Sequence, residues 1–291
     1  MSDRPVIVTG AGGYLGGAVA GHLHASGIPV LGIVRSPPTT ADFRWCALDL
    51  EVDSLADAWP SISPELVVHC AASVPLAQTR PDDEANAAST RAIDAGVVAA
   101  CARFGSRLIY VSSCILYDPF DPERKDERAP VQARTPYAAA KLEGEVRARA
   151  LDGSVVMRIP SPIGGSSGRR TVFDRFLERA VSGLSLEVWG TGGREQDFIH
   201  VTDIAEFVVR VRSDTVEGTF NVASGQPITM RALANTIVDV VGSGYVVSGN
   251  GSDPQDGHTA RYDIGAARRL LGWTPRMDVR AMIEHQSGHG R

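Results

Sequence analysis

The sequence predicts an α/β protein with a doubly wound parallel sheet and a smaller C-terminal lobe. Three observations carry this prediction. Short, continuously apolar runs recur through the first half of the chain, segments with helical patterns separate them, and Gly, Ser and Pro become frequent after Arg158. Parallel strands are buried on both faces and read as unbroken apolar runs, with helices as their crossovers.

The elements follow in order along the chain. Apolar runs of strand length predict strands at 6–8, 29–34, 45–48, 66–70 and 108–111. Helices are expected at 13–26, at 84–103 and, directly after Pro136, at 137–150, since proline favours the first helical turn. Beyond the change in composition we expect a strand at 186–189 and a helix at 203–212.

This change in composition divides the chain near residue 160. Residues 1–160 are expected to form the first domain. Residues 161–291 are expected to form mainly a second lobe that faces the substrate, with segments near 196–212 packing back on the first domain.

Composition excludes several classes of protein. The 291 residues are 43% hydrophobic and 22% charged, and the formal net charge of −5 gives no reason to expect a nucleic-acid partner. No apolar run is long enough for a membrane span, and the strand pattern that begins at Pro5 leaves no room for a signal peptide. Cys46, Cys70, Cys101 and Cys114 are scattered, which is typical of reduced thiols in a cytoplasmic protein and not of a metal site.

A glycine-rich turn, GAGGYLG, joins the first expected strand to the first expected helix. Gly10 permits a tight turn, Gly13 leaves room for a pyrophosphate, and Gly16 allows the helix to pack on the strand. The N-terminus of that helix, with Tyr14 and Leu15, supplies N–H groups to phosphates. The pattern predicts a Rossmann domain that binds NAD or NADP; the alternative is a glycine turn without a ligand.

The end of the second strand bears on the choice of dinucleotide. Val34 is followed by Arg35 and no acidic residue is near, so Arg35 could pair with the 2′-phosphate of NADP. This slightly favours NADP over NAD, unless Arg35 is simply exposed at a strand end. Asp49, next to Leu50, is a candidate partner for the adenine amino group or, equally, a turn residue before Glu51.

A second motif, YAAAK, places Tyr137 and Lys141 one helical turn apart. A carbonyl that is being reduced needs a proton, and tyrosine is a weak acid whose phenolate is favoured by a nearby ammonium. A serine hydroxyl from Ser112-Ser113, at the end of the fifth strand, can hold the carbonyl oxygen beside the phenol. Together with the glycine turn, this predicts hydride transfer with tyrosine as general acid/base.

These motifs resemble the extended short-chain dehydrogenase/reductase family, in its NAD-dependent epimerase/dehydratase branch of sugar-nucleotide epimerases and ketoreductases. The resemblance covers nearly the whole chain, through TGAGGYLG, HCAAS, VSSCILY, YAAAK, QDFIHVTDIA, FNVASG and LGWTP. It implies Ser113, Tyr137 and Lys141 as the catalytic triad, with Ser113 taken over Ser112 because it lies four positions before Tyr117.

The resemblance implies further residues and a partner. Ala71, Ala72 and Pro160 would line the cofactor, and Ser73 and Ser161 would contact the substrate. A homodimer would form through the helices at 84–103 and 137–150, although these helices could instead pack on the chain's own sheet.

The chain departs from its relatives in two places that bear on chemistry. Cys114 and Ile115 occupy the positions of the Asp-Glu pair that 4,6-dehydratases use for water elimination, so dehydration is not expected. Gln196 stands where an arginine often binds the diphosphate, and a second arginine before the C-terminal helix is also missing. Four arginines are candidates to replace them: Arg169, Arg170, Arg194 and Arg261.

We therefore expect an enzyme that transfers hydride at a sugar carbon, C4, of a small-molecule substrate that is a nucleotide sugar. A 4-ketoreductase and a 4-epimerase are the two leading hypotheses for its activity. The missing arginines leave a dehydrogenase of a free sugar or sugar acid as an alternative. A non-catalytic dinucleotide-binding sensor or scaffold is the alternative from another class.

Overall fold

A computed structural model describes residues 4–37, 42–58, 64–74, 83–165 and 171–288. In this part of the chain, seven strands form a central sheet in the order β11-β6-β5-β4-β1-β2-β3, and every neighbouring pair is parallel. The strands are β1 Val6–Thr9, β2 Val30–Val34, β3 Arg44–Ala47, β4 Leu66–His69, β5 Arg107–Ser113, β6 Val155–Ile159 and β11 Gly218–Asn221. The predicted doubly wound parallel sheet is confirmed.

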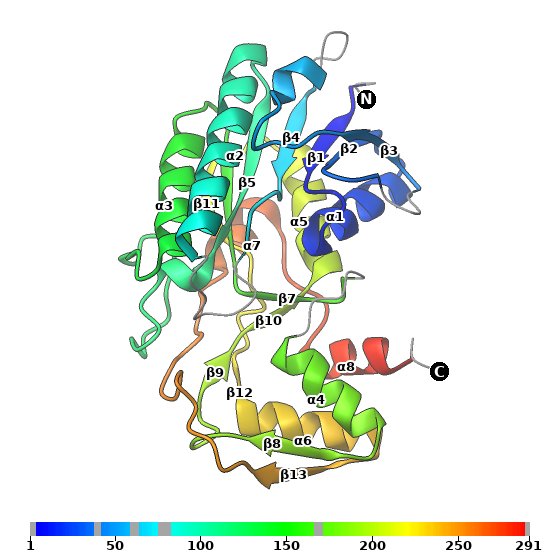
Figure 1. Cartoon of the computed structure of the whole chain (residues 1–291), viewed down its shortest axis with the longest axis vertical. Helices are drawn as coiled ribbons and strands as arrows, with labels where there is room; N and C mark the ends of the chain where they lie inside the picture. The colour runs from blue at the N-terminus through cyan, green and yellow to red at the C-terminus, as the bar shows by residue number, and fades with distance from the viewer. Residues whose placement is uncertain (1–3, 38–41, 59–63, 75–82, 166–170, 289–291) are drawn as a thin grey trace.

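Helices cover both faces of this sheet (Figure 1). On one face α1 (Tyr14–Ala25) packs against α5 (Val201–Arg212); on the other α2 (Asp83–Phe104) packs against α3 (Pro136–Arg149). Side chains alternate between the two cores along β1. Val6 and Val8 join the cluster with α1 and α5, whereas Ile7 joins the cluster with α2 and α3. This alternation is the reason why the inner strands β1 and β4 are nearly unbroken apolar runs.

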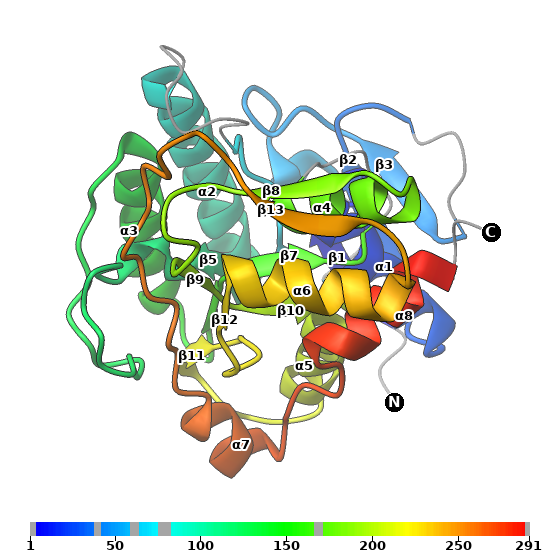
Figure 2. The same ribbon diagram turned by 90° about the horizontal axis from the view of Figure 1, so that it is seen from below.

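A smaller lobe has a core of its own. Its helices are α4 (Val172–Val181), α6 (Met230–Val241) and α8 (Val279–Gly288), and they pack with the parallel pair of β8 (Ser185–Val188) and β13 (Tyr245–Ser248). Figure 2 shows β8, β13 and α6 side by side. Local sequence fixes the helix ends: Thr171 and Asp174 form a capping box at the start of α4, and Gly242 ends α6 with a φ of 73°.

Short elements connect the lobes. The strand β7 (Ser161–Ile163) pairs in parallel with β10 (Phe198–His200), and β9 (Glu195–Gln196) pairs antiparallel with β12 (Ile228–Thr229). The remaining elements are η1 Leu55–Ala58, η2 Cys114–Leu116 and α7 Gly265–Leu271.

The chain beyond residue 160 contributes to both lobes. After β9 and β10 the chain returns to the larger lobe. There α5 packs in the core and β11 joins the central sheet. The two lobes therefore meet along the carboxyl end of the sheet, where parallel α/β folds bind their ligands. Within the described residues, no helix combines the length and the apolar character needed to cross a bilayer.

Candidate active site

A cleft of about 650 Å³ lies between the carboxyl end of the sheet and the smaller lobe. It brings together predicted residues from widely separated parts of the chain. The predicted site residues that line it are Gly10, Gly13, Tyr14, Leu15, Gly16, Ala72, Ser113, Tyr137, Lys141, Pro160, Ser161 and Arg194. The glycine turn, the predicted catalytic residues and one predicted substrate-binding arginine thus share a single cleft.

The glycine turn is packed so closely that side chains are excluded from it. Gly10 has a φ of 66°, and a Cβ on it would lie 2.9 Å from the backbone of Ala71. A Cβ on Gly16 would lie 2.2 Å from the carbonyl oxygen of Gly10. The N-cap residue of α1 is Gly13, which has no side chain to cap the helix, so the positive end of the helix dipole meets the cleft. This turn fits a dinucleotide pyrophosphate.

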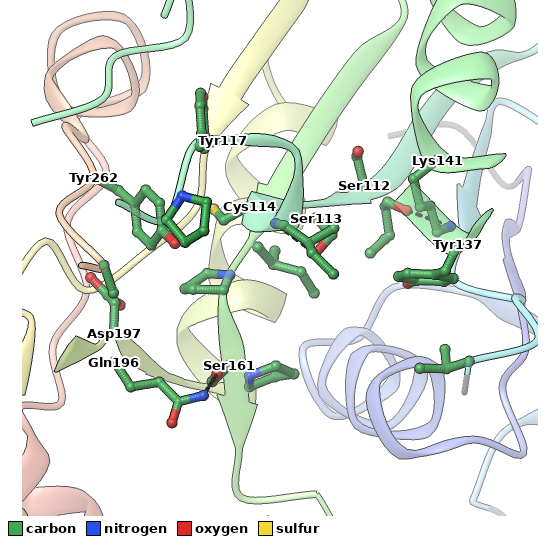
Figure 3. A pocket seen from close by; sticks show the side chains of 18 of the residues that line it. Ser112, Ser113, Cys114, Tyr117, Tyr137, Lys141, Ser161, Gln196, Asp197 and Tyr262 are labelled. Atoms are coloured by element: carbon green, nitrogen blue, oxygen red, sulfur yellow. Dashed lines mark hydrogen bonds between the residues drawn. The ribbon is translucent and has the colours of Figure 1, made fainter. Parts of the chain in front are cut away.

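Tyr137 and Lys141 are held by the first two turns of α3. Thr135 caps this helix by accepting a hydrogen bond from Ala138 N at 3.1 Å, and Pro136 is its first residue. The ammonium of Lys141 is buried, donates to the carbonyl of Val111 at 3.0 Å and lies 4.8 Å from the centre of the Tyr110 ring. Figure 3 shows Tyr137 and Lys141 at one end of the cleft, with Ser113 beside them.

The two adjacent serines at the end of β5 have different surroundings. Ser112 also lines the cleft, but it is buried and its Oγ donates to Oε1 of the buried Glu145 at 2.6 Å. Oγ of Ser113 accepts from the backbone N–H of Ile115 at 3.2 Å, so its own hydroxyl hydrogen can be donated to a ligand. Geometry therefore favours Ser113 as the donor to a substrate oxygen.

Glu145, which engages Ser112, belongs to a buried ion pair. Arg158 donates to its two carboxylate oxygens at 2.9 and 2.8 Å. Burial alone would raise the pKa of Glu145, but the hydrogen bonds and charge of Arg158 hold this pKa below its ordinary value. This pair fixes α3 against β6 and holds the carboxylate that accepts from Ser112.

Four predicted cofactor residues lie outside the residues that line the cleft. Arg35 is exposed directly after β2, and Leu50 is partly buried against the core beneath the sheet. Oδ1 of Asp49 accepts from the backbone N–H of Glu51 at 3.1 Å. This contact is typical of a turn, the alternative role expected for Asp49. The backbone N–H of Ala71 donates to Oγ1 of Thr9 at 3.2 Å.

Only some of the predicted substrate residues line the cleft. Ser161 accepts from Nε2 of Gln196 at 2.9 Å within the cleft, and Arg194 pairs with Asp253 at 2.8 Å at its rim. Two others do not line the cleft: Oγ of Ser73 donates to Asn86 at 2.6 Å, and Arg261 forms a two-pronged pair with Glu195 at 2.8 to 3.2 Å. Arg170, like Arg169, lies outside the described residues.

Several cleft residues were not expected from the sequence. Arg134 lies three residues before Tyr137 and pairs with Asp118 at 2.9 Å, and its position next to a catalytic motif was the one signal available for it. Tyr262 and His258 come from a loop without a recognisable pattern. Figure 3 shows Tyr262 with Asp197 at the end of the cleft opposite Tyr137.

Asp197 is fully buried at that far end. Its two carboxylate oxygens accept from the backbone N–H groups of Ser224 and Gly225, each at 2.8 Å. Burial raises the pKa of Asp197 to about 7, and the two backbone hydrogen bonds only partly oppose this rise. The carboxylate thereby ties β10 to the loop after β11 at the junction of the lobes.

Cys114 and Ile115, directly after Ser113, also line the cleft. Sγ of Cys114 contacts the carbonyl of Arg158 at 3.5 Å, and burial raises the pKa of this thiol well above its ordinary value. Ile115 is partly exposed and has no proton to transfer. Neither side chain can act as a carboxylate acid or base.

The comparisons with known proteins extend over most of the chain. The family model of the NAD dependent epimerase/dehydratase family matches residues 6–223. The chain is 26% identical over 293 residues to a UDP-glucose 4-epimerase of Mycolicibacterium smegmatis, which covers 93% of each chain. It is also 26% identical over 305 residues to a dTDP-4-dehydro-6-deoxy-D-allose reductase of Streptomyces bikiniensis, covering 96% of this chain and 91% of the relative.

Solved structures share the fold. The crystal structure of a UDP-glucose 4-epimerase of Thermotoga maritima with UDP-glucose superposes with a TM-score of 0.85 over 99% of this chain and 100% of that chain, at 20% identity. Both lobes of the present structure therefore have their counterpart in a sugar-nucleotide epimerase fold.

Proposed function

Since the chain belongs to the NAD dependent epimerase/dehydratase family, we propose that it transfers hydride at a sugar carbon, C4, of a nucleotide sugar. The observation that carries this proposal is the meeting of the glycine turn, Ser113, Tyr137 and Lys141 in one cleft. A dinucleotide-binding scaffold would have no need of a phenol and an ammonium beside the same cavity. The sequence relatives include both an epimerase and a reductase of nucleotide sugars.

Each residue has a role that follows from its surroundings. The glycine turn and the start of α1 would hold the pyrophosphate of a nicotinamide dinucleotide, which supplies or accepts the hydride. Tyr137 donates its phenolic proton to the sugar oxygen on reduction and takes a proton from it on oxidation. Ser113 donates a hydrogen bond to the same oxygen, and the ammonium of Lys141 stabilises the negative charge that develops on Tyr137.

The proposal covers a 4-ketoreductase and a 4-epimerase. A ketoreductase ends after one hydride transfer, whereas an epimerase returns the hydride to the other face of the sugar. Arg35 favours the reductase, because it favours NADP, and a net reductase exchanges its dinucleotide in every turnover. A 4,6-dehydratase is not proposed, since Cys114 and Ile115 offer no carboxylate for eliminating water.

A specific observation favours a second candidate, a dehydrogenase of a free sugar or sugar acid. Gln196 stands at the position of a diphosphate-binding arginine, Arg194 pairs with Asp253, and Arg261 pairs with Glu195. Binding of a nucleoside diphosphate separates the two candidates. A rise in Tm on adding UDP or dTDP supports the nucleotide-sugar substrate, because a ligand of the native state stabilises it by mass action.

The replacement Tyr137→Phe tests the chemistry. We expect the variant to bind the dinucleotide as the wild type does and to lose turnover by a factor of about 10² to 10⁴, the usual contribution of a general acid/base. Tyr245→Phe is the matched control, because Tyr245 is exposed on β13 in the smaller lobe. Near-normal turnover in Tyr137→Phe would overturn the proposed role.

A further inference from the structure

A cluster of buried polar side chains lies behind Lys141, on the side of α3 that faces the sheet. It consists of His69 at the end of β4, Asp94 in the middle of α2 and Tyr110 in β5, none of them more than 1% exposed. Nε2 of His69 lies 2.9 Å from Oδ1 of Asp94, and the hydroxyl of Tyr110 donates to Oδ2 of Asp94 at 2.6 Å. The carboxylate of Asp94 thus has one partner on each oxygen.

The hydrogen bonds of this cluster form a consistent chain if His69 is neutral. The backbone N–H of Ala71 donates to Oγ1 of Thr9, so the hydroxyl hydrogen of Thr9 is available for Nδ1 of His69, 2.7 Å away. Nε2 of His69 then carries the ring hydrogen and donates it to Asp94. His69 thereby fixes Oδ1 of Asp94 in place.

The opposite charge comes from Lys141. Its ammonium lies 4.8 Å from the centre of the Tyr110 ring, whose hydroxyl binds Asp94, and it is 3% exposed at the residue level. Burial alone would raise the pKa of Asp94, but the Lys141 charge, followed by the hydrogen bond and charge of His69 and by the hydrogen bond from Tyr110, holds this pKa below its ordinary value. A buried ammonium is costly unless an opposite charge compensates it.

Gly144, one turn after Lys141 in α3, makes room for this arrangement. A Cβ on Gly144 would lie 2.0 Å from the hydroxyl of Tyr110 and 2.4 Å from Oδ2 of Asp94. Glycine is unfavourable inside a helix, so a residue without a side chain at this place needs a packing reason. The approach of α3 to the Asp94–Tyr110 pair supplies that reason.

We propose that Asp94 is a positioning residue that supplies the buried counter-charge for Lys141. It keeps Lys141 as an ammonium that is fixed against the carbonyl of Val111 and beside Tyr137. The pairing of Asp94 with Lys141 rests on their shared neighbour Tyr110 and on the lowered pKa of Asp94; its consequence for catalysis rests on the proposed function.

The other titratable groups around Lys141 do not supply this charge. Cys70, after β4, stays a neutral thiol because burial raises its pKa to about 12. Tyr110 stays a neutral phenol because burial and the neighbouring Asp94 raise its pKa well above the ordinary value. Glu145, in α3, is paired with Arg158. Tyr137 and Asp94 remain as the acidic groups that face the ammonium, and Asp94 is the one that carries a charge throughout the reaction.

A double-mutant cycle tests the pairing without any substrate. It compares Asp94→Asn, Lys141→Met and the double variant by thermal unfolding. Asparagine keeps the size of Asp94 and can bond both His69 and Tyr110, once the Tyr110 hydroxyl turns from donor to acceptor. We expect the double variant to unfold about 3 °C or more above the Tm predicted by adding the two single effects, because it leaves no uncompensated charge.

The same cycle stays decisive if Asp94→Asn does not fold. Recovery of a cooperative unfolding transition on adding Lys141→Met supports the pairing. Additive Tm changes, or a double variant that fails to recover, would overturn it. Neither result depends on the protein having the proposed activity.

The pH dependence of kcat/KM for ketone reduction tests the catalytic consequence. A buried negative charge opposes the loss of a proton from groups near it. Asp94→Asn should therefore move the alkaline limb of the profile to lower pH by about one pH unit. Tyr110→Phe is the matched control: it removes the hydrogen bond from Tyr110 to Asp94, keeps the charge of Asp94, and should leave the limb in place.

An unmoved limb in Asp94→Asn, or an equal shift in Tyr110→Phe, would overturn the positioning role. A wild type without turnover on any nucleotide sugar would instead contradict the proposed function, and the unfolding cycle would still decide whether Asp94 and Lys141 are paired.

Discussion

Replacing Ser112 and Ser113 separately by alanine should separate an effect on stability from an effect on catalysis. Ser112 is 2% exposed and donates to the buried carboxylate of Glu145 at 2.6 Å, whereas Ser113 faces the cleft and accepts from a backbone N–H. The chemical change is the same in both variants, so each serves as the control for the other.

The magnitudes follow from these contacts. A hydrogen bond to a charged group contributes about 1.5–3 kcal/mol, and Oε1 of Glu145 keeps its bond from Arg158 when Ser112 is replaced. Ser112→Ala should therefore lower the free energy of unfolding by about 2 kcal/mol, or Tm by roughly 3–4 °C, and leave kcat/KM within a few-fold of the wild type.

Ser113→Ala should do the reverse. Its hydroxyl caps only the short helix η2, so the loss of unfolding free energy should stay below about 1 kcal/mol. The loss of a hydrogen-bond donor to the sugar oxygen should lower kcat/KM about 100-fold. Chemical denaturation and steady-state kinetics measure the two quantities. A catalytic loss in Ser112→Ala with normal turnover in Ser113→Ala would refute the reasoning.

Three further predictions concern the dinucleotide turn, the choice of dinucleotide and the response to acid. Gly16→Ala should weaken dinucleotide binding at least tenfold in a titration, because its Cβ would lie 2.2 Å from the Gly10 carbonyl oxygen; unchanged affinity would contradict the role of the turn. Arg35→Ser should lower the ratio of NADP to NAD affinity by about tenfold, and an unchanged ratio would exclude a contact with the 2′-phosphate. His200 is buried, and burial and His285 lower its pKa to about 4. Between about pH 6.5 and 4 this histidine therefore binds a proton in the unfolded chain but not in the folded one. The wild type should then lose up to about 3 kcal/mol of unfolding free energy over this range, and His200→Asn, which keeps a capping acceptor without titrating, should lose less; equal losses would contradict the assignment.

Sequence reasoning located the first half of the fold because each strand there is an apolar run between recognisable helices. The predicted strand at 108–111 lies within β5, and the helix predicted at 137–150 became α3 (Pro136–Arg149). The helix predicted at 203–212 lies within α5, where its apolar side packs on α1. Local pattern decided these elements, so local pattern could predict them.

The return of β11 to the sheet could not be predicted in the same way. Gly218–Asn221 is short, and its place beside β6 depends on the packing of the whole lobe. The same holds for the loop that carries His258 and Tyr262 to the cleft, because no spacing in the sequence links it to the motifs.

The sequence also did not show which polar side chains are buried and bonded to other residues. Both Ser112 and Ser113 end the same strand, and only the ion pair of Glu145 and Arg158 shows which one is occupied elsewhere. Asp94 lies in an Ala-rich helix with no motif around it, and its importance became visible only from its contacts with His69 and Tyr110.

Isotope transfer tests the central claim most directly. The protein, loaded with a nicotinamide dinucleotide, is given a nucleotide sugar with deuterium at C4. The dinucleotide and the sugar are then recovered, and mass spectrometry measures the deuterium content of each. Hydride transfer at C4 predicts deuterium on the nicotinamide when the reaction is quenched within the first turnover, with none released to water. Deuterium lost to water, or a converted sugar whose quenched nicotinamide never carries deuterium, would contradict the account.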